Sequence, residues 1–442
     1  MAKTSKSMVK KPYITIQNVG PIKDITLPLN RVNVLIGPQS SGKSTIAKLL
    51  SFCSWLEKEM TINQKSIKTD EEYIKKNLFD YHRIGSYFDD KSVVIYEDDC
   101  MKFTFSNMHA ETKKCDGFAD SLSHKTAYIP AERIMASVPN VRSFQLFHSS
   151  LQTFLFDWWK MGPIITREKA IEIPDTGVSY YYDPKTNRDI VKLPDDNELD
   201  LMEASSGLQS LIPMYVYLKY VTEWVYEHED VQSYDRTSIY DKALTRRMIS
   251  NRESVSEEEI DEYIKDSENP TISAKNVLQL ARNYHTHGME LPNIIRELVE
   301  LADNIAHAHY TNIIIEEPEL NLFPHTQIEF LYALLRMFKS DRDTMVITTH
   351  SPYLLYALNN CMLADSVKDK LLDEELKDAV DFRGVAINPK EVSVWELNDG
   401  KLSGLSAKNQ SIQDEKGYIR GNYFDRIMGN VMSDFNNLLS LQ

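Results

Sequence analysis

The first hundred residues consist of short β-rich runs followed by a helix. Two runs, Tyr13–Ile16 and Ile25–Leu27, contain alternating and β-branched residues and predict strands. A third run, Val32–Ile36, is nearly all apolar, as expected of a strand buried on both faces. From Thr45 to Leu56 apolar residues recur at helical spacing. The pattern therefore predicts a buried strand, a tight turn and a core-facing helix in direct succession.

Further along the chain the pattern predicts two hairpins, several helices and two more buried strands. The predicted hairpins are 93–105 and 180–193, the predicted helices are 144–159, 208–225 and 327–338, and the predicted strands are 312–315 and 344–348. Near the end of the chain, residues 392–402 predict a third hairpin. Residues 227–293 are polar and charged, which indicates a helical insertion between two parts of one domain, 1–226 and 294–442.

Composition is that of an ordinary globular protein of 442 residues, with 42% hydrophobic and 26% charged positions. The formal charge of −15 opposes the diffuse phosphate attraction that a generic DNA-binding protein needs. No run approaches the roughly 20 apolar residues that span a bilayer, and the Lys-rich start lacks the apolar core of a signal peptide. We therefore expect a cytoplasmic protein whose four cysteines are free thiols.

The turn after the third strand carries the clearest chemical motif. Residues 37–44 fit the pattern G-x-x-x-x-G-K-[ST], a P-loop, at the required place between a buried strand and a helix. In such a loop backbone N–H groups surround phosphate, Lys43 bridges the terminal phosphate oxygens, and the Ser44 hydroxyl coordinates Mg²⁺. The predicted nucleotide-binding residues are Gly37, Pro38, Gln39, Ser40, Ser41, Gly42, Lys43, Ser44 and Thr45. The predicted cofactors are ATP and Mg²⁺.

Three further elements follow the P-loop in the chain. The strand 312–315 ends in the carboxylates Glu316 and Glu317, which either bind near magnesium and an attacking water or are simply solvated. The next strand ends at His350, well placed to hydrogen-bond the γ-phosphate. Residues 204–210 precede an apolar helix and form either a second anion site or a plain N-cap.

Taken in this order, the four elements resemble the ABC-type ATPase heads of the SMC, RecF and overcoming-lysogenisation-defect group. The resemblance implies an α/β fold, a P-loop ATPase head with a mixed sheet, an antiparallel β subdomain and a helical insertion. It identifies residues 205–209 as the signature, Glu316 and Glu317 as the end of the Walker B strand, 318–322 as the D-loop and His350 as the switch.

The resemblance also implies roles for these residues. Two ATP molecules would lie between two heads arranged head to tail, as a dimer or a higher even homo-oligomer. The signature residues Ser205, Ser206 and Gly207 would act on the nucleotide of the other subunit. Glu317 would be the general base, Glu316 would hold magnesium with Ser44, and His350 and Lys43 would act on the γ-phosphate.

This sequence departs from the family pattern at three points. Glu316 stands where the family usually has aspartate, and Leu208 replaces the second signature glycine. No Q-loop glutamine is evident, and the segment 129–133 is a candidate for its role, with Arg133 as a nucleotide or interface contact.

Within the group, the segments 16–22, 37–44, 128–133 and 205–209 resemble the ATPase subunits of the PARIS anti-phage systems. That resemblance implies a slow ATPase that acts as scaffold and sensor, with a separate Toprim nuclease effector and a phage-encoded trigger protein as partners. The 92 residues after His350 contain no Asp-x-Asp pair, so we expect nuclease chemistry to come from another chain.

The alternative is a RecF-like or SMC-like repair ATPase that clamps DNA directly, which the acidic charge disfavours. A transporter subunit is disfavoured by the insertion, which we interpret as a docking surface or, alternatively, a solvated decoration.

Overall fold

The structure, a computed structural model, describes residues 11–138, 148–226, 243–249, 257–265, 292–338, 340–371, 382–404 and 411–441, together with 276, 277, 279 and 283. At its centre is a six-stranded sheet in the order β15-β14-β3-β13-β12-β7. Its strands are β3 (Val32–Ile36), β7 (His124–Ile129), β12 (Tyr310–Glu316), β13 (Thr344–Thr348), β14 (Val392–Asn398) and β15 (Lys401–Leu402). Only β15 pairs antiparallel with its neighbour; the other pairs are parallel.

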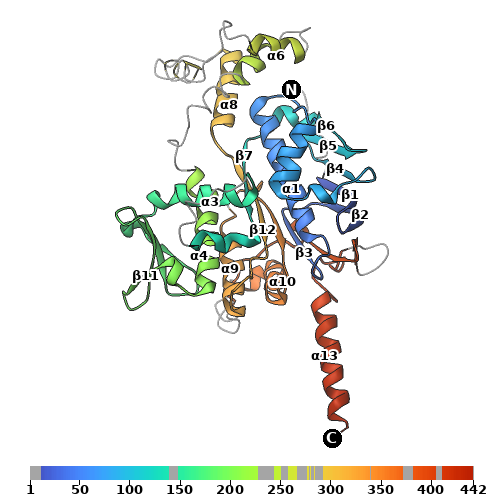
Figure 1. Ribbon diagram of the computed structural model, residues 1–442, viewed down its shortest axis with the longest axis vertical. Coiled ribbons are helices and arrows are strands. Elements are labelled where there is room, and N and C mark those ends of the chain that lie inside the picture. The colour runs from blue at the N-terminus through green and yellow to red at the C-terminus, as the bar shows by residue number, and fades with distance from the viewer. Residues whose placement is uncertain are drawn as a thin grey trace.

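Both faces of this sheet are buried, because successive side chains join different cores. Ile313 and Ile315 of β12 belong to a core shared with four helices, while Ile314 between them belongs to the core that contains α1 (Lys43–Asn63). The four helices of the first core are α3 (Ser150–Met161), α4 (Ser206–Thr222), α9 (Pro324–Arg336) and α10 (Pro352–Ser366). Helices α1 and α4 therefore lie on opposite faces of the sheet (Figure 1).

A second sheet is antiparallel and packs with α1 in the same core. Its order is β2-β1-β4-β5-β6, with strands β1 (Tyr13–Val19), β2 (Ile22–Pro28), β4 (Val93–Glu97), β5 (Met101–Ser106) and β6 (His109–Lys114). The predicted hairpin at 93–105 is confirmed as β4 and β5, and β6 extends it. The helical turn α2 (Glu71–Ile74) leads into a turn of π-helix at 75–80.

A third sheet, in the order β11-β10-β9-β8, stands beside α4. Its strands are β8 (Ile171–Glu172), β9 (Ser179–Asp183), β10 (Arg188–Lys192) and β11 (Glu198–Asp200). The predicted hairpin at 180–193 is confirmed as β9 and β10. Of the helix predicted at 144–159, residues 144–147 lie outside the described residues.

Most of the predicted insertion, 227–293, also lies outside the described residues. The part that is described includes helix α6 (Glu257–Lys265), and helix α8 (Asn293–Ala306) follows the insertion. A small separate core joins α8 to the insertion through Leu298 and Leu301 on one side and Ala243, Leu244 and Val277 on the other. The division into 1–226, 227–293 and 294–442 stays a prediction.

The C-terminal part of the chain completes the architecture. After the short helix α11 (Lys368–Leu371), β14 and β15 form the predicted hairpin, and β14 also joins the central sheet beside β3. The last helix, α13 (Tyr423–Leu439), projects away from the body (Figure 1). Among the described residues no helix is both long and apolar enough to cross a membrane. The predicted fold class, an α/β P-loop ATPase head with an antiparallel subdomain, is confirmed.

Candidate functional site

The predicted motifs meet at one edge of the central sheet. Because the carboxyl ends of parallel strands share an edge, the segments that follow β3, β13, β12 and β7 converge there. These segments carry the P-loop, His350, the Glu316–Glu317 pair and Arg133 respectively. Gln39 and Ser40 of the P-loop are exposed, whereas Gly37, Ser41, Gly42, Lys43 and Thr45 are buried and Pro38 and Ser44 lie between these extremes.

Two P-loop glycines are required by the local backbone. Gly37 has φ of 144° and Gly42 has φ of 103°, both in the region that side chains disfavour. A Cβ at Gly37 would lie 2.2 Å from the carbonyl oxygen of Leu397 on β14, and one at Gly42 would lie 2.7 Å from Ile22. The loop is therefore pressed against β14 on one side and the antiparallel sheet on the other.

The ammonium of Lys43 lies inside the P-loop. Its Nζ donates to the carbonyl oxygens of Gly37 at 3.0 Å and Pro38 at 2.8 Å. Burial lowers the pKa of Lys43 to about 8, an effect that the carboxylates of Glu317 and Glu319 oppose. At neutral pH the side chain is mainly a cation, the charge state that binds phosphate.

Glu316 ends β12 and is almost fully buried. The hydroxyl of Tyr128, on the neighbouring strand β7, donates to its Oε1 at 2.6 Å. Burial raises the pKa of Glu316, while the Tyr128 hydrogen bond and Lys48 of α1 act in the opposite direction. A buried carboxylate of this kind and the hydroxyl of Ser44 are oxygen donors that suit Mg²⁺, which would hold phosphate oxygens in place when bound.

Glu317 follows in a left-handed conformation, with φ of 44°. That conformation is unfavourable for a non-glycine residue, at about 1–3 kcal/mol, and it turns the chain sharply as it leaves the sheet. The turn brings Glu317 Oε1 to 3.8 Å from Nε2 of His350. Both side chains are about 30% exposed, so the pair faces solvent at the edge of the sheet.

The surroundings of His350 favour the uncharged form of its imidazole at neutral pH. Burial lowers its pKa, Lys43 lowers it further, and Glu317 opposes the shift. A neutral imidazole beside a carboxylate can donate or accept a hydrogen bond at a phosphate or a water. Lys43, Glu317 and His350, predicted from separate parts of the sequence, are thus electrostatically coupled in one site.

Arg133 is fully buried and lies beneath the carboxylate pair. Its guanidinium donates to the backbone carbonyl of Glu316 at 2.9 Å and to that of Glu317 at 2.8 Å. Burial lowers its pKa to about 10. In this structure Arg133 therefore positions the backbone of Glu316 and Glu317, and it has no exposed surface for the predicted nucleotide or interface contact.

The predicted signature segment, residues 205–209, lies at the start of α4. Ser205 is the N-cap, with its Oγ accepting from the N–H of Leu208 at 3.4 Å, and both Ser205 and Ser206 are exposed. A Cβ at Gly207 would lie 3.1 Å from the carbonyl oxygen of Asn321, so the signature touches the D-loop segment 318–322 of the same chain. Ser205 is therefore confirmed as the N-cap of α4. The second anion site at these exposed serines stays a prediction.

Two residues that carry the geometry have no role in the sequence-based prediction. Tyr128 orders the Glu316 carboxylate, and Glu319 accepts hydrogen bonds from the loop that carries His350. All of these contacts join residues 30 or more positions apart, so they depend on which strands are neighbours. The motif Glu316–Glu319 contains a third carboxylate, which is the one sequence signal for Glu319.

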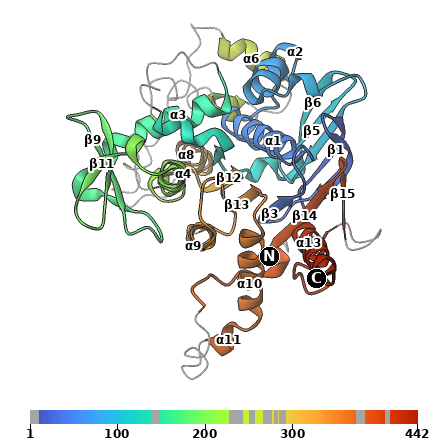
Figure 2. The same ribbon diagram turned by 60° about the horizontal axis from the view of Figure 1, so that its bottom comes forward.

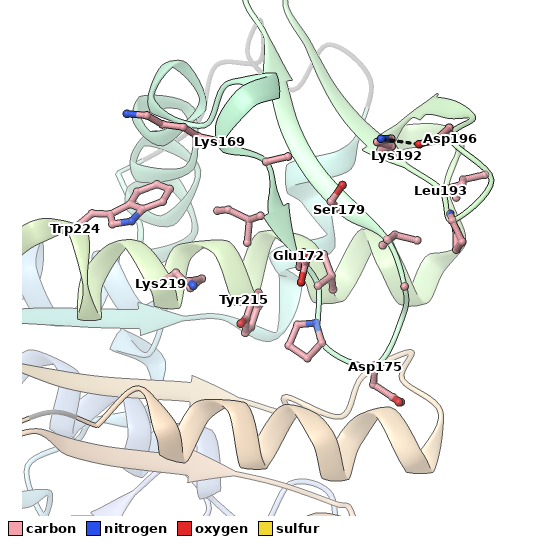
Figure 3. Close-up of a pocket in the computed structure, with 17 residues that line it drawn as sticks. Lys169, Glu172, Asp175, Ser179, Lys192, Leu193, Asp196, Tyr215, Lys219 and Trp224 are labelled. Carbon is pink, nitrogen blue, oxygen red and sulfur yellow. Dashed lines mark ion pairs between the residues drawn. The ribbon is translucent and has the colours of Figure 1, made fainter. Parts of the chain in front are cut away.

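A cavity of about 980 Å³ lies elsewhere in the structure. It lies between α4 and the third sheet, with Lys169, Glu172, Tyr215, Lys219 and Trp224 among its lining residues (Figure 3). No residue of the P-loop, of the Glu316–Glu317 pair or of the switch lines it, so it is separate from the site described above.

Comparisons with known proteins agree with the P-loop assignment. Residues 12–142 match the family described as an AAA ATPase domain. None of the curated proteins matches the chain. The match covers the P-loop and supports ATPase activity.

Several solved structures align with most of the chain at low identity. The SMC head domain from Thermotoga maritima aligns at 9% identity and a TM-score of 0.32, covering 78% of this chain and 90% of that one. The recombination mediator RecF aligns at 10% identity and a TM-score of 0.28, covering 90% and 99%. An ATP-binding cassette of an ABC transporter in its ADP conformation aligns at 9% identity and a TM-score of 0.29, covering 91% and 94%.

Proposed function

We propose that this protein binds ATP and magnesium at the edge formed by β3, β12 and β13 and hydrolyses the ATP slowly, as a signal. The observation that carries the proposal is the approach of Glu317 and His350 to 3.8 Å beside the P-loop lysine. These groups come from the ends of three strands. A P-loop lysine that holds the phosphates and a side chain that orients the attacking water are recurring parts of phosphoryl-transfer sites.

Each residue of the site has a distinct proposed role. Lys43 exchanges its two P-loop carbonyl partners for the terminal phosphate oxygens, and Ser44 and Glu316 hold Mg²⁺. Glu317 accepts a proton from the attacking water, since it is the more exposed of the two adjacent carboxylates. His350 hydrogen-bonds the γ-phosphate.

A second copy of the chain would complete the nucleotide-binding site. The signature serines are exposed and begin a helix on the face of the sheet opposite α1. Two chains arranged head to tail bring Ser205 and Ser206 of each to the P-loop of the other. Closure of this dimer would report that ATP is bound.

We further propose that the ATPase is the scaffold and sensor of a cytoplasmic two-protein defence against phage. The support is the resemblance of the segments 16–22, 37–44, 128–133 and 205–209 to AriA, the ATPase subunit of the PARIS system. In this proposal the protein holds a Toprim nuclease, as AriA holds AriB, until a phage-encoded trigger protein releases it.

The test is a co-purification with the natural flanking genes. Glu317→Gln should hold ATP without hydrolysing it and so keep the assembly closed, while Lys43→Ala, the matched control, should not bind ATP. A Toprim protein that elutes in stoichiometric amount with Glu317→Gln, identified by mass spectrometry, supports the scaffold. DNA alone, or no partner, would instead favour a RecF-like or SMC-like clamp.

A further inference from the structure

The C-terminal helix α13 has no covering partner within the described part of the chain. It runs from Tyr423 to Leu439, and none of its residues is buried. Figure 1 shows it projecting from the body with the C-terminus at its far end, and Figure 2 shows it leaving the body beside β14 and β15. Beyond its first turn the helix buries no side chain against the described part of the chain, and a helix of this length is marginal in water without a packing surface.

One side of α13 is an apolar stripe. We call the following seven residues, each 45–67% exposed, the α13 stripe: Ile427, Met428, Val431, Met432, Phe435, Leu438 and Leu439. Its central members Met428, Val431, Phe435 and Leu438 are spaced by three, four and three residues, the repeat that packs one helix along another. The opposite side of the helix carries Ser433, Asn437 and Ser440.

The first turn of α13 is fixed to the body. The Asn422 side chain caps the helix, accepting from the N–H groups of Phe424 and Asp425. Arg426 pairs with the buried Glu396 of β14, and Tyr356 of α10 donates to Asp425. These contacts hold the start of the helix, so the direction in which the stripe projects is set by the fold.

The stripe is neutral. Between residues 427 and 441 the only charged side chain is Asp434, at the margin of the stripe, although the chain as a whole carries −15. A partner of different sequence on so acidic a protein would be expected to use complementary charge, which this surface lacks. A second copy of α13 needs no complementary charge, because the apolar stripes of the two helices can pack against each other.

The available area suits such a pairing. Seven large side chains, each exposing about half of its surface, can remove on the order of 600 Å² from water per helix. Two helices together then approach the roughly 1,200 Å² at which stable protein interfaces begin. In a parallel pair Asp434 would face the apolar Leu439, whereas in an antiparallel pair the two Asp434 carboxylates would approach each other.

We propose that α13 is an interface between copies of this chain, in which two α13 helices pair in parallel through the α13 stripe. This contact uses no residue of the nucleotide site and forms without ATP. It is therefore a second assembly contact, independent of the ATP-dependent pairing proposed above.

The test is the mass of the full chain in nucleotide-free buffer, measured by light scattering. The wild type should be at least a dimer of the 51.0-kDa chain, and Val431→Asp with Leu438→Asp should reduce it to 51.0 kDa. Ser433→Asp with Asn437→Asp, which adds the same charge on the opposite side, should keep the wild-type mass. Since no α13 residue is buried, circular dichroism should show the body folded in both variants.

A cross-link tests the parallel arrangement. Val431→Cys should form a disulfide between copies under mild oxidation, and Ser433→Cys should not.

A wild-type mass of 51.0 kDa at tens of micromolar would overturn the proposal and assign the stripe to a different protein or a lipid surface. Loss of mass without a Val431→Cys cross-link would overturn the parallel pairing. Failure of ATP binding would leave these outcomes unchanged.

Discussion

The carboxylate of Glu319 holds the backbone of His350. Its Oε1 accepts from the His350 N–H at 2.5 Å, and its Oε2 accepts from the Thr349 hydroxyl at 2.8 Å. The two strands β12 and β13 are thereby tied together just beyond their paired ends. The position of His350 relative to Glu317 thus depends on a third carboxylate, which itself need not touch the nucleotide.

Glu319→Gln tests this tie. The amide keeps one accepting oxygen and loses the other, so the His350 loop should shift while the P-loop stays intact. We expect ATP turnover to fall about 10- to 100-fold, because a small misplacement of reacting groups has effects of this size. ATP binding should be retained.

Phosphate release and fluorescent-ATP binding measure the two effects separately. Glu111→Gln, on an exposed position of β6, is the matched control and should behave as the wild type. Unchanged turnover in Glu319→Gln would refute the positioning role.

Arg133→Met tests the buried guanidinium under the carboxylate pair. The substitution leaves the carbonyls of Glu316 and Glu317 without their buried donor, at a cost of about 1–3 kcal/mol for each. We expect urea unfolding to show a loss of roughly 2–6 kcal/mol in the free energy of unfolding, and turnover to fall further than ATP affinity. Loss of ATP binding in Arg133→Met without loss of stability would contradict the positioning role and would favour a direct contact between Arg133 and the nucleotide.

His82 predicts a pH dependence of stability. It is buried between Tyr81 and Tyr128, its Nδ1 has no hydrogen-bond partner, and burial lowers its pKa to about 3. The unfolded chain takes up this proton near pH 6.5, whereas the folded chain does not, so acidification below 6.5 favours unfolding. At pH 5.5 this histidine should lower the free energy of unfolding by about 1.4 kcal/mol relative to pH 7.5.

His82→Phe removes the titrating group and keeps the ring contacts. The difference in unfolding free energy between pH 7.5 and 5.5, measured with urea, should shrink by that amount, and stability at pH 7.5 should stay equal or rise. A variant that loses as much stability on acidification as the wild type would show that His82 is protonated in the folded chain.

The elements that carry the motifs could be predicted from sequence because their signals are local. The apolar run Val32–Ile36 followed by a glycine-rich turn is β3 and the P-loop, and the run ending at Glu316 is β12. Helix boundaries were less accurate. The helix predicted at 208–225 is α4, Ser206–Thr222, since the N-cap Ser205 starts the helix earlier and a separate 3-10 turn follows it.

Features that depend on strand order could not be predicted. The roles of Tyr128, Arg133 and Glu319 arise because β12 lies between β7 and β13, and no local pattern specifies that order. The hairpin at 392–402 was predicted, but its pairing with β3 was not. Helix α13 is not among the predicted elements, although Met428, Val431, Phe435 and Leu438 recur at helical spacing.

The most direct test of the account is ATP turnover and binding in Glu317→Gln and Lys43→Ala beside the wild type. Removal of the general base should lower phosphate release at least about 100-fold while ATP still binds. Removal of the P-loop cation should abolish binding, and turnover with it. Normal ATP turnover in both variants would contradict the assignment of this edge of the sheet as the catalytic site.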